Sequence, residues 1–530
     1  MTLSAVLAML LVAFTDSSSV KVTGSVESNS AVYVKDAADG GSASSGWGSN
    51  NYLRLDLTSR HIDAGLQAEY YPVPLRGYQS ELKGLGLPMG YIRYRTGNFD
   101  ILGGNFYEQY GSGLLLRSWE DRQLGINNSI FGVRTSFNSR NGIVKASAMA
   151  GLPRYCQSLS STILAGTDVG LDFSKIIGTS AVSLLLEGSF LHRYERNVPD
   201  MLQLLAKDKF EIPQNVSSYS VRASLSSESF SLKFENVWKG KDFHTDKQYR
   251  ESDGYSLRTG NAQLLEVGWS HGAFSADMSL RRLSNMQHLM FRTYESVTAG
   301  NTLNYIPALC QQQTYMLASL NPYVPIADGE FGGQADLFYN FRKKTAIGGR
   351  YGMKLHVGGS MFYALPQALS NWTTTRLAYR DINIDIEKRF NRHFKMILFV
   401  SIQECSPTHG DRFATVAQNV FVTEFLYNIN SALSLRGEIQ YLYSREMQKD
   451  WVAGLLEVSL APSWSIYVSD MYNHGSTGIH YYDFGASYSR GTFRLAAGFG
   501  RHREGMVCSG GVCRYQPAFT GGSLQLTYRF

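Results

Sequence analysis

Apolar residues recur at every second position in segments of about ten residues, from residue 19 to the end of the chain. In the C-terminal segment, Leu524, Leu526, Tyr528 and Phe530 fall on one face, and polar residues alternate with them. A period of two is that of a β-strand with two different faces, whereas the 3.6-residue spacing of helices is rare here. The pattern predicts an all-β chain.

The segments group into hairpins, each with a short turn and followed by a longer polar loop. Eleven hairpins with one further strand at each end predict about 24 strands, within a range of roughly 22 to 26. Short turns are expected near Arg60, Gly97, Arg140, Gly178, Glu228, Gly272, Lys343, Arg392, Ile429, Pro462 and Arg490. The longer loops are expected at 36–50, 73–88, 107–128, 195–216, 241–260, 285–331, 364–376, 405–413 and 503–520.

Short turns on one rim and long loops on the other are typical of an outer-membrane barrel, whose turns are periplasmic and whose loops are extracellular. A soluble sandwich also alternates apolar and polar residues, so alternation alone does not separate the two classes. The polar face here carries charges of both signs, which favours a single transmembrane antiparallel β-barrel with a wet lumen. The candidate lumen-facing residues are Arg54, Asp56, Arg222, Lys233, Glu235, Asp381, Asp385, Glu387, Arg436, Glu438, Asp483 and Arg494.

The N-terminus carries a ten-residue apolar run from Ala5 to Phe14. This is the length of the apolar region of a signal peptide, and it is shorter than the roughly 20 residues of a membrane-spanning helix. We therefore expect a signal peptide at 1–18, with its start truncated because the basic region is missing, and a barrel over 19–530. These assignments predict a bacterial outer-membrane location.

Composition narrows the function classes. The 13 % aromatic content argues against disorder, and the net charge of +6 is spread thinly, without the basic stripe that nucleic acid requires. The sequence holds no Gly-x-Ser-x-Gly or His-Glu-x-x-His motif and no cysteine or histidine grouping at metal spacing. We predict no catalytic residue, cofactor or metal site, and no enzyme. Cys508 and Cys513 lie close enough to form a disulfide, but two free thiols explain them equally well.

Two loops contain features that are unusual for solvated segments. Loop 107–128 combines the charged residues Glu108, Glu120, Asp121 and Arg122 with the apolar run Leu114 to Leu116. Loop 285–331 is far longer than the usual connection and holds many apolar and aromatic residues, among them Tyr305 and Tyr315. We predict that both loops fold inward as a lumen cap, with these residues as constriction candidates. The alternative for loop 107–128 is a strand extension above the membrane.

The last segment, with Phe530 as its final residue, resembles the C-terminal signature of Gram-negative outer-membrane proteins. The resemblance implies recognition of Phe530 by the barrel assembly machinery and places this residue at the periplasmic rim. The segments 104–114, 118–122, 124–129 and 303–309 resemble parts of a functionally uncharacterised family of large Bacteroidota outer-membrane β-barrel proteins. This second resemblance implies the fold and the compartment, and no activity.

The sequence thus predicts a channel or transporter-like barrel embedded in outer-membrane lipid. A barrel of this size exceeds the 16 to 18 strands of open porins, so we expect inward-folded extracellular loops to occlude the lumen. The alternative is a structural or docking component that binds another envelope protein in an assembly or secretion complex.

Overall fold

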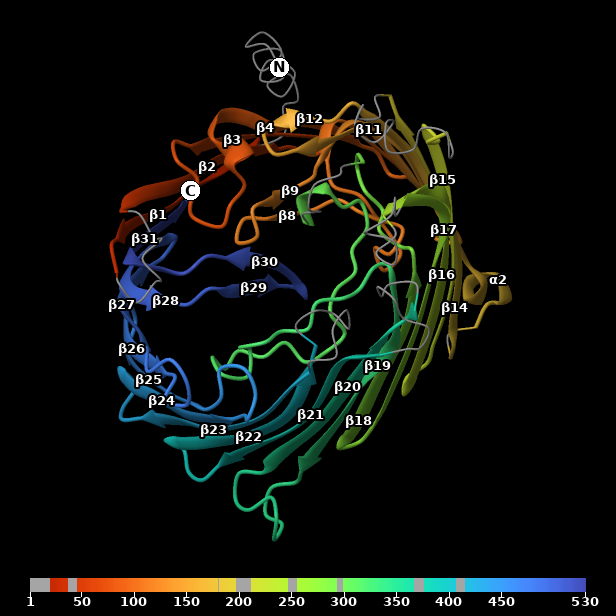
Figure 1. Cartoon of the computed structure of the whole chain (residues 1–530). Helices are drawn as coiled ribbons and strands as arrows, with labels where there is room; N and C mark the ends of the chain where they lie inside the picture. Colours follow the sequence, from red (N-terminus) through yellow and green to blue (C-terminus); the bar gives the residue numbers. More distant parts are fainter. Residues whose placement is uncertain are drawn as a thin grey trace.

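The computed structural model describes residues 20–36, 45–179, 181–196, 211–245, 255–292, 299–366, 376–406 and 415–530. One antiparallel sheet forms a ring that encloses several loop segments (Figure 1). The expected signal peptide at 1–18 lies outside the described residues. Within the described ranges, no helix is both long and apolar enough to cross a membrane.

The ring confirms the predicted all-β antiparallel barrel and its strand number of 24. β1 pairs with β2 on one side and with β31 on the other, and this second pairing closes the sheet. The barrel strands are β1 (Lys21–Val34), β2 (Gly46–Thr58), β3 (Ile62–Tyr71), β4 (Gly84–Arg95), β5 (Phe99–Phe106), β10 (Ile130–Asn138), β11 (Val144–Tyr155), β13 (Thr162–Asp172), β14 (Ser183–Glu195), β15 (Asn215–Ser226), β16 (Phe230–Thr245), β17 (Tyr255–His271), β18 (Phe274–Ser284), β19 (Gly329–Phe341), β20 (Met353–Ala364), β21 (Arg376–Arg389), β22 (Phe394–Cys405), β23 (Val416–Asn428), β24 (Leu433–Tyr443), β25 (Trp451–Leu460), β26 (Trp464–Tyr472), β27 (His480–Arg490), β28 (Phe493–His502) and β31 (Phe519–Arg529).

The remaining elements lie in the connections between barrel strands. They are η2 (Ser80–Leu82), β6 (Gln109–Tyr110), β7 (Leu116–Arg117), β8 (Glu120–Asp121), β9 (Ile126–Asn127), β12 (Ser158–Leu159), α2 (Phe173–Ile177), η4 (Ala299–Asn301), β29 (Gly505–Ser509) and β30 (Val512–Gln516).

The two faces of the ring differ as the period of two requires. In β21, Ile382 and Ile384 are 52 % and 41 % exposed on the outer face, whereas the intervening Asn383 and the neighbouring Asp381 are buried on the inner face. In β23, the inner residues Val420 and Val422 are buried against residues of the connection between β18 and β19. The core of the molecule therefore lies inside the ring, between its wall and the enclosed segments.

Four connections differ from the sequence prediction. The turn near Gly178 contains α2, which begins after Asp172, whose carboxylate accepts a hydrogen bond from the Lys175 amide, and ends at Gly178 in the left-handed region (φ 76°). The connection near Lys343 covers 342–352 and is longer than a tight turn. On the opposite rim, the connections 444–450 and 473–479 are short, so the sorting of loop lengths is incomplete.

The β1–β31 seam is closed at one end by Phe530. The amide of Phe530 donates to the Gly24 carbonyl at 3.0 Å, and the Gly24 amide donates to the Phe530 carbonyl at 2.9 Å. The Phe530 ring lies on Gly24 so closely that a Cβ at this glycine would come within 2.3 Å of it. Gly24 therefore leaves the space that this aromatic ring occupies.

Candidate functional site

The first interior segment, 107–128, connects β5 to β10 and carries β6 to β9. Its apolar run Leu114, Leu115 and Leu116 is at most 2 % exposed, because it packs against inner residues of the wall. The Ser112 amide donates to the Glu235 carboxylate of β16 at 3.0 Å. These residues of the segment therefore lie against inner residues of the wall.

The second interior segment comprises 285–292 and 299–328 of the connection from β18 to β19, and these residues lie inside the ring. Near its start, the Arg193 guanidinium of β14 donates to the Leu289 carbonyl at 2.6 Å. Further along, the Leu317 amide donates to the Gln440 side chain of β24 at 3.0 Å. One segment thus contacts wall strands from β14 to β24.

The third interior segment is the hairpin of β29 and β30, which was expected only as part of a loop. Cys508 and Cys513 face each other across the hairpin and form a disulfide, so the first of the two alternatives for this pair holds. Figure 1 shows the hairpin projecting into the ring from the wall strands β28 and β31. A disulfide restricts the hairpin to few conformations.

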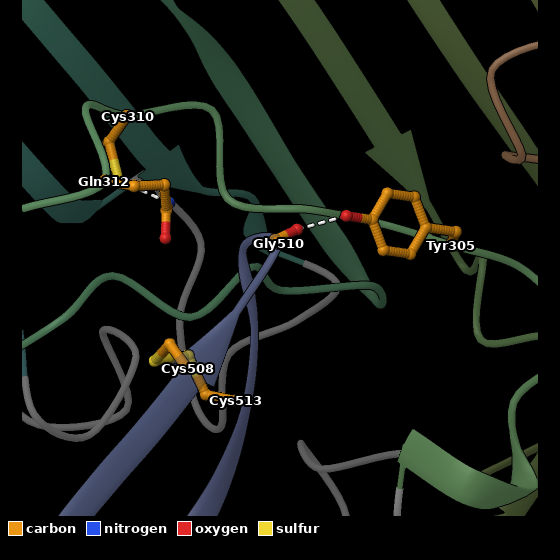
Figure 2. The surroundings of a disulfide bond; sticks show 6 residues. All are labelled: Tyr305, Cys310, Gln312, Cys508, Gly510 and Cys513. Carbon is orange, nitrogen blue, oxygen red and sulfur yellow. Dashed lines mark hydrogen bonds between the residues drawn. A yellow bond between two sulfur atoms is a disulfide. The ribbon is translucent and has the colours of Figure 1, made fainter. Parts of the chain in front are cut away.

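Backbone hydrogen bonds join the three interior segments to one another. The Arg117 amide donates to the Leu303 carbonyl at 2.8 Å, and the Tyr305 amide donates to the Gly113 carbonyl at 2.9 Å. The Ala308 amide donates to the Gly511 carbonyl at the hairpin tip at 3.0 Å. Figure 2 shows the neighbouring bond from the Tyr305 hydroxyl to the Gly510 carbonyl. The segments therefore form one connected body inside the barrel.

A buried ionic cluster fixes the start of the second interior segment. The Arg292 guanidinium pairs with Glu195 of β14 at 2.6 Å and with Asp242 of β16 at 2.8 Å. Arg193 pairs with Asp242 from the other side at 2.8 Å. All four side chains are at most 4 % exposed, so each charge depends on its partners.

His288 lies beside this cluster and is buried. Burial, together with the nearby positive charges of Arg193 and Lys239, lowers the pKa of His288 to about 3. The imidazole is therefore neutral at physiological pH while the segment is in place.

Most of the predicted lumen-facing residues take part in pairs or networks along the wall. Arg54 pairs with Asp56 at 2.7 Å, and Arg436 pairs with Glu424 at 2.9 Å and also with Glu438. The other contacts are Arg222 with Asp168 and Glu187, Glu235 with Ser220 and Ser112, Asp381 with Ser401 and Asn383, Asp385 with His356, Glu387 with Lys354 and Lys395, and Asp483 with Tyr467. Lys233 and Arg494 are exposed.

The predicted constriction residues hold the interior segments in place. Arg122 pairs with Glu27 of β1 at 2.7 Å and with Glu120 at 3.0 Å. Asp121 accepts from the Leu124 amide at 2.9 Å, within its own segment. The others bind across segments: Glu108 pairs with Arg134 of β10, Tyr305 donates to Gly510, and Tyr315 donates to Glu424 of β23 at 2.9 Å.

The sequence prediction missed the buried cluster. Asp242 fell within the expected loop 241–260, because a register shift between Lys239 and Asp242 interrupts the alternation of β16. Glu195 stood at the edge of the expected loop 195–216, although the polar positions of β14 continue through Arg193 to Glu195. Extending the period of two by one pair would have found Glu195, whereas Asp242 lies beyond the shift and falls out of the period.

Residues 1–530 match a family model described as a family of unknown function, DUF6029. No curated protein matches the sequence.

Several solved structures resemble the barrel at low identity. The siderophore receptor PirA from Pseudomonas aeruginosa is 9 % identical, with 96 % of this chain and 80 % of that chain covered, at a TM-score of 0.43. The P pilus usher (PapC) translocation pore is 9 % identical, with 96 % and 99 % covered, at 0.44. OccAB3 from Acinetobacter baumannii is 7 % identical, with 96 % and 99 % covered, at 0.38. At these scores the likenesses carry no argument about function.

We predict that Arg292→Met releases the second interior segment from the wall while the barrel stays assembled. The change leaves Glu195 buried without its cation, which costs about 3 to 5 kcal/mol. Limited proteolysis should cut the segment faster in this variant, and heat-modifiable migration should be retained. Arg342→Met, at an exposed arginine in the connection 342–352, is the control. Equal cleavage rates in the two variants would show that the cluster does not hold the segment.

We also predict that acidification loosens the start of this segment through His288. The released imidazole takes up a proton below its ordinary pKa of about 6.5, whereas the buried one resists protonation down to about 3. The free energy that favours the docked segment therefore falls as the pH drops below about 6.5, by about 1.4 kcal/mol per pH unit. Hydrogen exchange of 286–292, corrected for intrinsic rates, should show this dependence. His288→Asn should reduce it, and an unchanged dependence would contradict the assignment.

Proposed function

The chain belongs to the DUF6029 family of unknown function, and from its own structure we propose that it is an integral outer-membrane β-barrel of the channel or transporter kind. We propose further that its inward-folded extracellular loops occlude the lumen. The observation that carries this proposal is the connected body of interior segments, bonded to the wall from β1 to β24.

The outer face supports insertion into a membrane. Its side chains are large and apolar, and they stay exposed in the closed barrel, as the residues of β21 show. An apolar belt of this kind is unfavourable in water and favourable in lipid. The closed sheet leaves no strand edge, so the backbone hydrogen bonds of the wall are satisfied without water.

The inner face supports a polar lumen. Charges of both signs occur along the inner positions and pair between neighbouring strands, as Arg436 of β24 does with Glu424 of β23. We assign the twelve predicted lumen-facing residues to this surface. A wall of paired charges tolerates water and polar solutes without the cost of an isolated buried ion.

The size of the barrel supports occlusion. Barrels of 16 to 18 strands already enclose an aqueous channel, so a ring of 24 strands without a filler would leave a wide opening. The interior segments supply this filler from the chain's own loops, and their many contacts with the wall hold them inside.

The proposal includes a route of export and insertion into the outer membrane. We infer a Bacteroidota origin from the resemblance of the segments around Gly104 and Leu303, and export through a signal at 1–18. The barrel assembly machinery would recognise Phe530, outer-membrane lipid would surround the barrel, and an envelope protein could bind its rims.

A docking role is the second candidate, and one surface favours it. An open hollow of about 710 Å³ lies on the turn-bearing rim, lined by serines and asparagines of the turns around 430 and 462, by apolar residues such as Leu433 and Trp464, and by Arg392. These groups could accept an extended segment of another envelope protein.

Membrane insertion is tested on β31 with two adjacent residues. Leu524 is 48 % exposed on the outer face, and Gln525 is exposed on the other face. We expect Leu524→Arg to destabilise the barrel in lipid vesicles by about 2 to 4 kcal/mol more than Gln525→Arg, if the site lies near the bilayer midplane. Urea unfolding followed by heat-modifiable migration measures the difference. Equal effects would exclude lipid contact at Leu524.

Occlusion is tested by removing the second interior segment. Ser284 and Gly329 pair directly across β18 and β19, so a short Asn-Gly turn can replace 286–327 without straining the wall. We expect higher single-channel conductance in planar bilayers and higher permeability to bulky antibiotics.

The matched control replaces 343–351 on the opposite rim, where the connection lies outside the connected body. Unchanged conductance in an assembled deletion variant, with loss of a co-purifying protein, would replace the occlusion proposal by the docking role.

A further inference from the structure

A cavity of about 270 Å³ lies between the second interior segment and the disulfide hairpin. One side is formed by the consecutive residues Gln311, Gln312 and Gln313, and the other by Met506, Val507 and the disulfide of Cys508 and Cys513. Figure 2 shows Gln312 and Cys310 on the segment and the disulfide on the hairpin. The cavity thus has walls from two parts of the chain that lie almost 200 residues apart.

No described residue that lines this cavity is charged. This differs from the wall around it, where charged side chains pair along most strands. A charged solute entering the cavity would lose its hydration and find no opposite charge to replace it. The cavity therefore favours an uncharged ligand.

Three consecutive glutamine side chains line the cavity and give it amide donors and acceptors. The Gln311 Oε1 and Gln313 Nε2 atoms are buried and have no hydrogen-bond partner among the described residues. A molecule in the cavity meets the amide atoms of the three glutamines that remain accessible. They match a ligand that has both donors and acceptors, such as hydroxyl and amide groups.

The remaining lining limits size and shape. Tyr379 of β21 and Tyr323 of the segment add aromatic surface, and Met506 adds an adaptable apolar side chain. The volume lies just below the usual range of roughly 300 to 1,000 Å³ for ligand pockets. The ligand must therefore be small, with one apolar face and a polar edge.

We propose that this cavity binds a small uncharged solute that carries hydroxyl and amide groups, of the size of a single N-acetylated sugar. The glutamine amides pair with its polar edge, and Met506, Val507 and the edges of the two tyrosine rings contact its apolar face. This proposal depends only on the cavity, and it applies whether the protein is a channel or a docking component. Binding can therefore be tested without measuring conductance.

The test uses the full-length protein in detergent and calorimetric titration with three related probes. N-acetylglucosamine carries the hydroxyl and amide groups, glucose carries the hydroxyl groups only, and glucosamine carries a positive charge. We expect N-acetylglucosamine to bind most tightly, glucose more weakly, and glucosamine at least tenfold more weakly than the N-acetylated sugar. Failure of all three to bind at millimolar concentration, or equal binding of glucosamine, would overturn the proposal.

Variants locate the binding. Gln311→Leu and Gln313→Leu should each weaken N-acetylglucosamine binding at least tenfold, whereas Gln525→Leu in β31 should leave it unchanged. Retained heat-modifiable migration verifies assembly. Binding that survives both substitutions would place the sugar elsewhere and refute the site.

A second measurement needs no glutamine variant. Cys310 lines the same cavity as a free thiol. N-acetylglucosamine should slow its alkylation by N-ethylmaleimide at least threefold, with Cys310→Ser identifying the labelled thiol. An alkylation rate that the sugar does not change would count against occupancy of the cavity.

Discussion

The pairing of β1 with β31 is the interaction on which the rest of the structure depends. It joins Ser25 to Arg529 and Val34 to Thr520 across nearly the whole chain, and it leaves the sheet without an edge. Only a closed sheet satisfies its backbone groups without water, so the apolar exterior and the enclosed interior both follow from this seam. The Phe530 ring on Gly24 covers the place where the two strands meet.

Inside the ring, ionic contacts add to apolar packing in holding the interior segments against the wall. Asp242 receives two guanidinium groups, one from the wall strand β14 and one from the second interior segment. Arginine suits this position, because its planar fork binds carboxylates in a fixed geometry and stays charged when buried. A guanidinium and a carboxylate pair in few geometries, whereas apolar side chains pack in many. The ionic contact therefore fixes the position of the segment more strictly than an apolar contact such as leucine with valine could.

The fold was largely predictable, and the site only in part. Strands such as β31 have an apolar outer face and a polar inner face, so the alternation of the two residue types is clear in the sequence. Counting the alternating segments gave the number of strands. The interior segments showed an apolar excess at Leu114 and Tyr315, which indicated burial but not a partner. Contacts such as Arg292 with Glu195 join residues 97 positions apart, and no local pattern encodes them. The sequence analysis did not predict the hairpin of β29 and β30, because each of its strands has five residues, too few to show a clear period of two.

The second interior segment leaves the wall at Ser284 and returns at Gly329, two residues that face each other across adjacent strands. Both of its ends are therefore tied to neighbouring points of a rigid sheet. Once displaced, such a segment stays at an effective concentration in the millimolar range near its own binding surface. Its return is a unimolecular step whose rate does not depend on how much protein the membrane holds. For the occlusion proposed above, a displaced segment therefore returns to the wall unless something else occupies the segment or the surface that it uncovers.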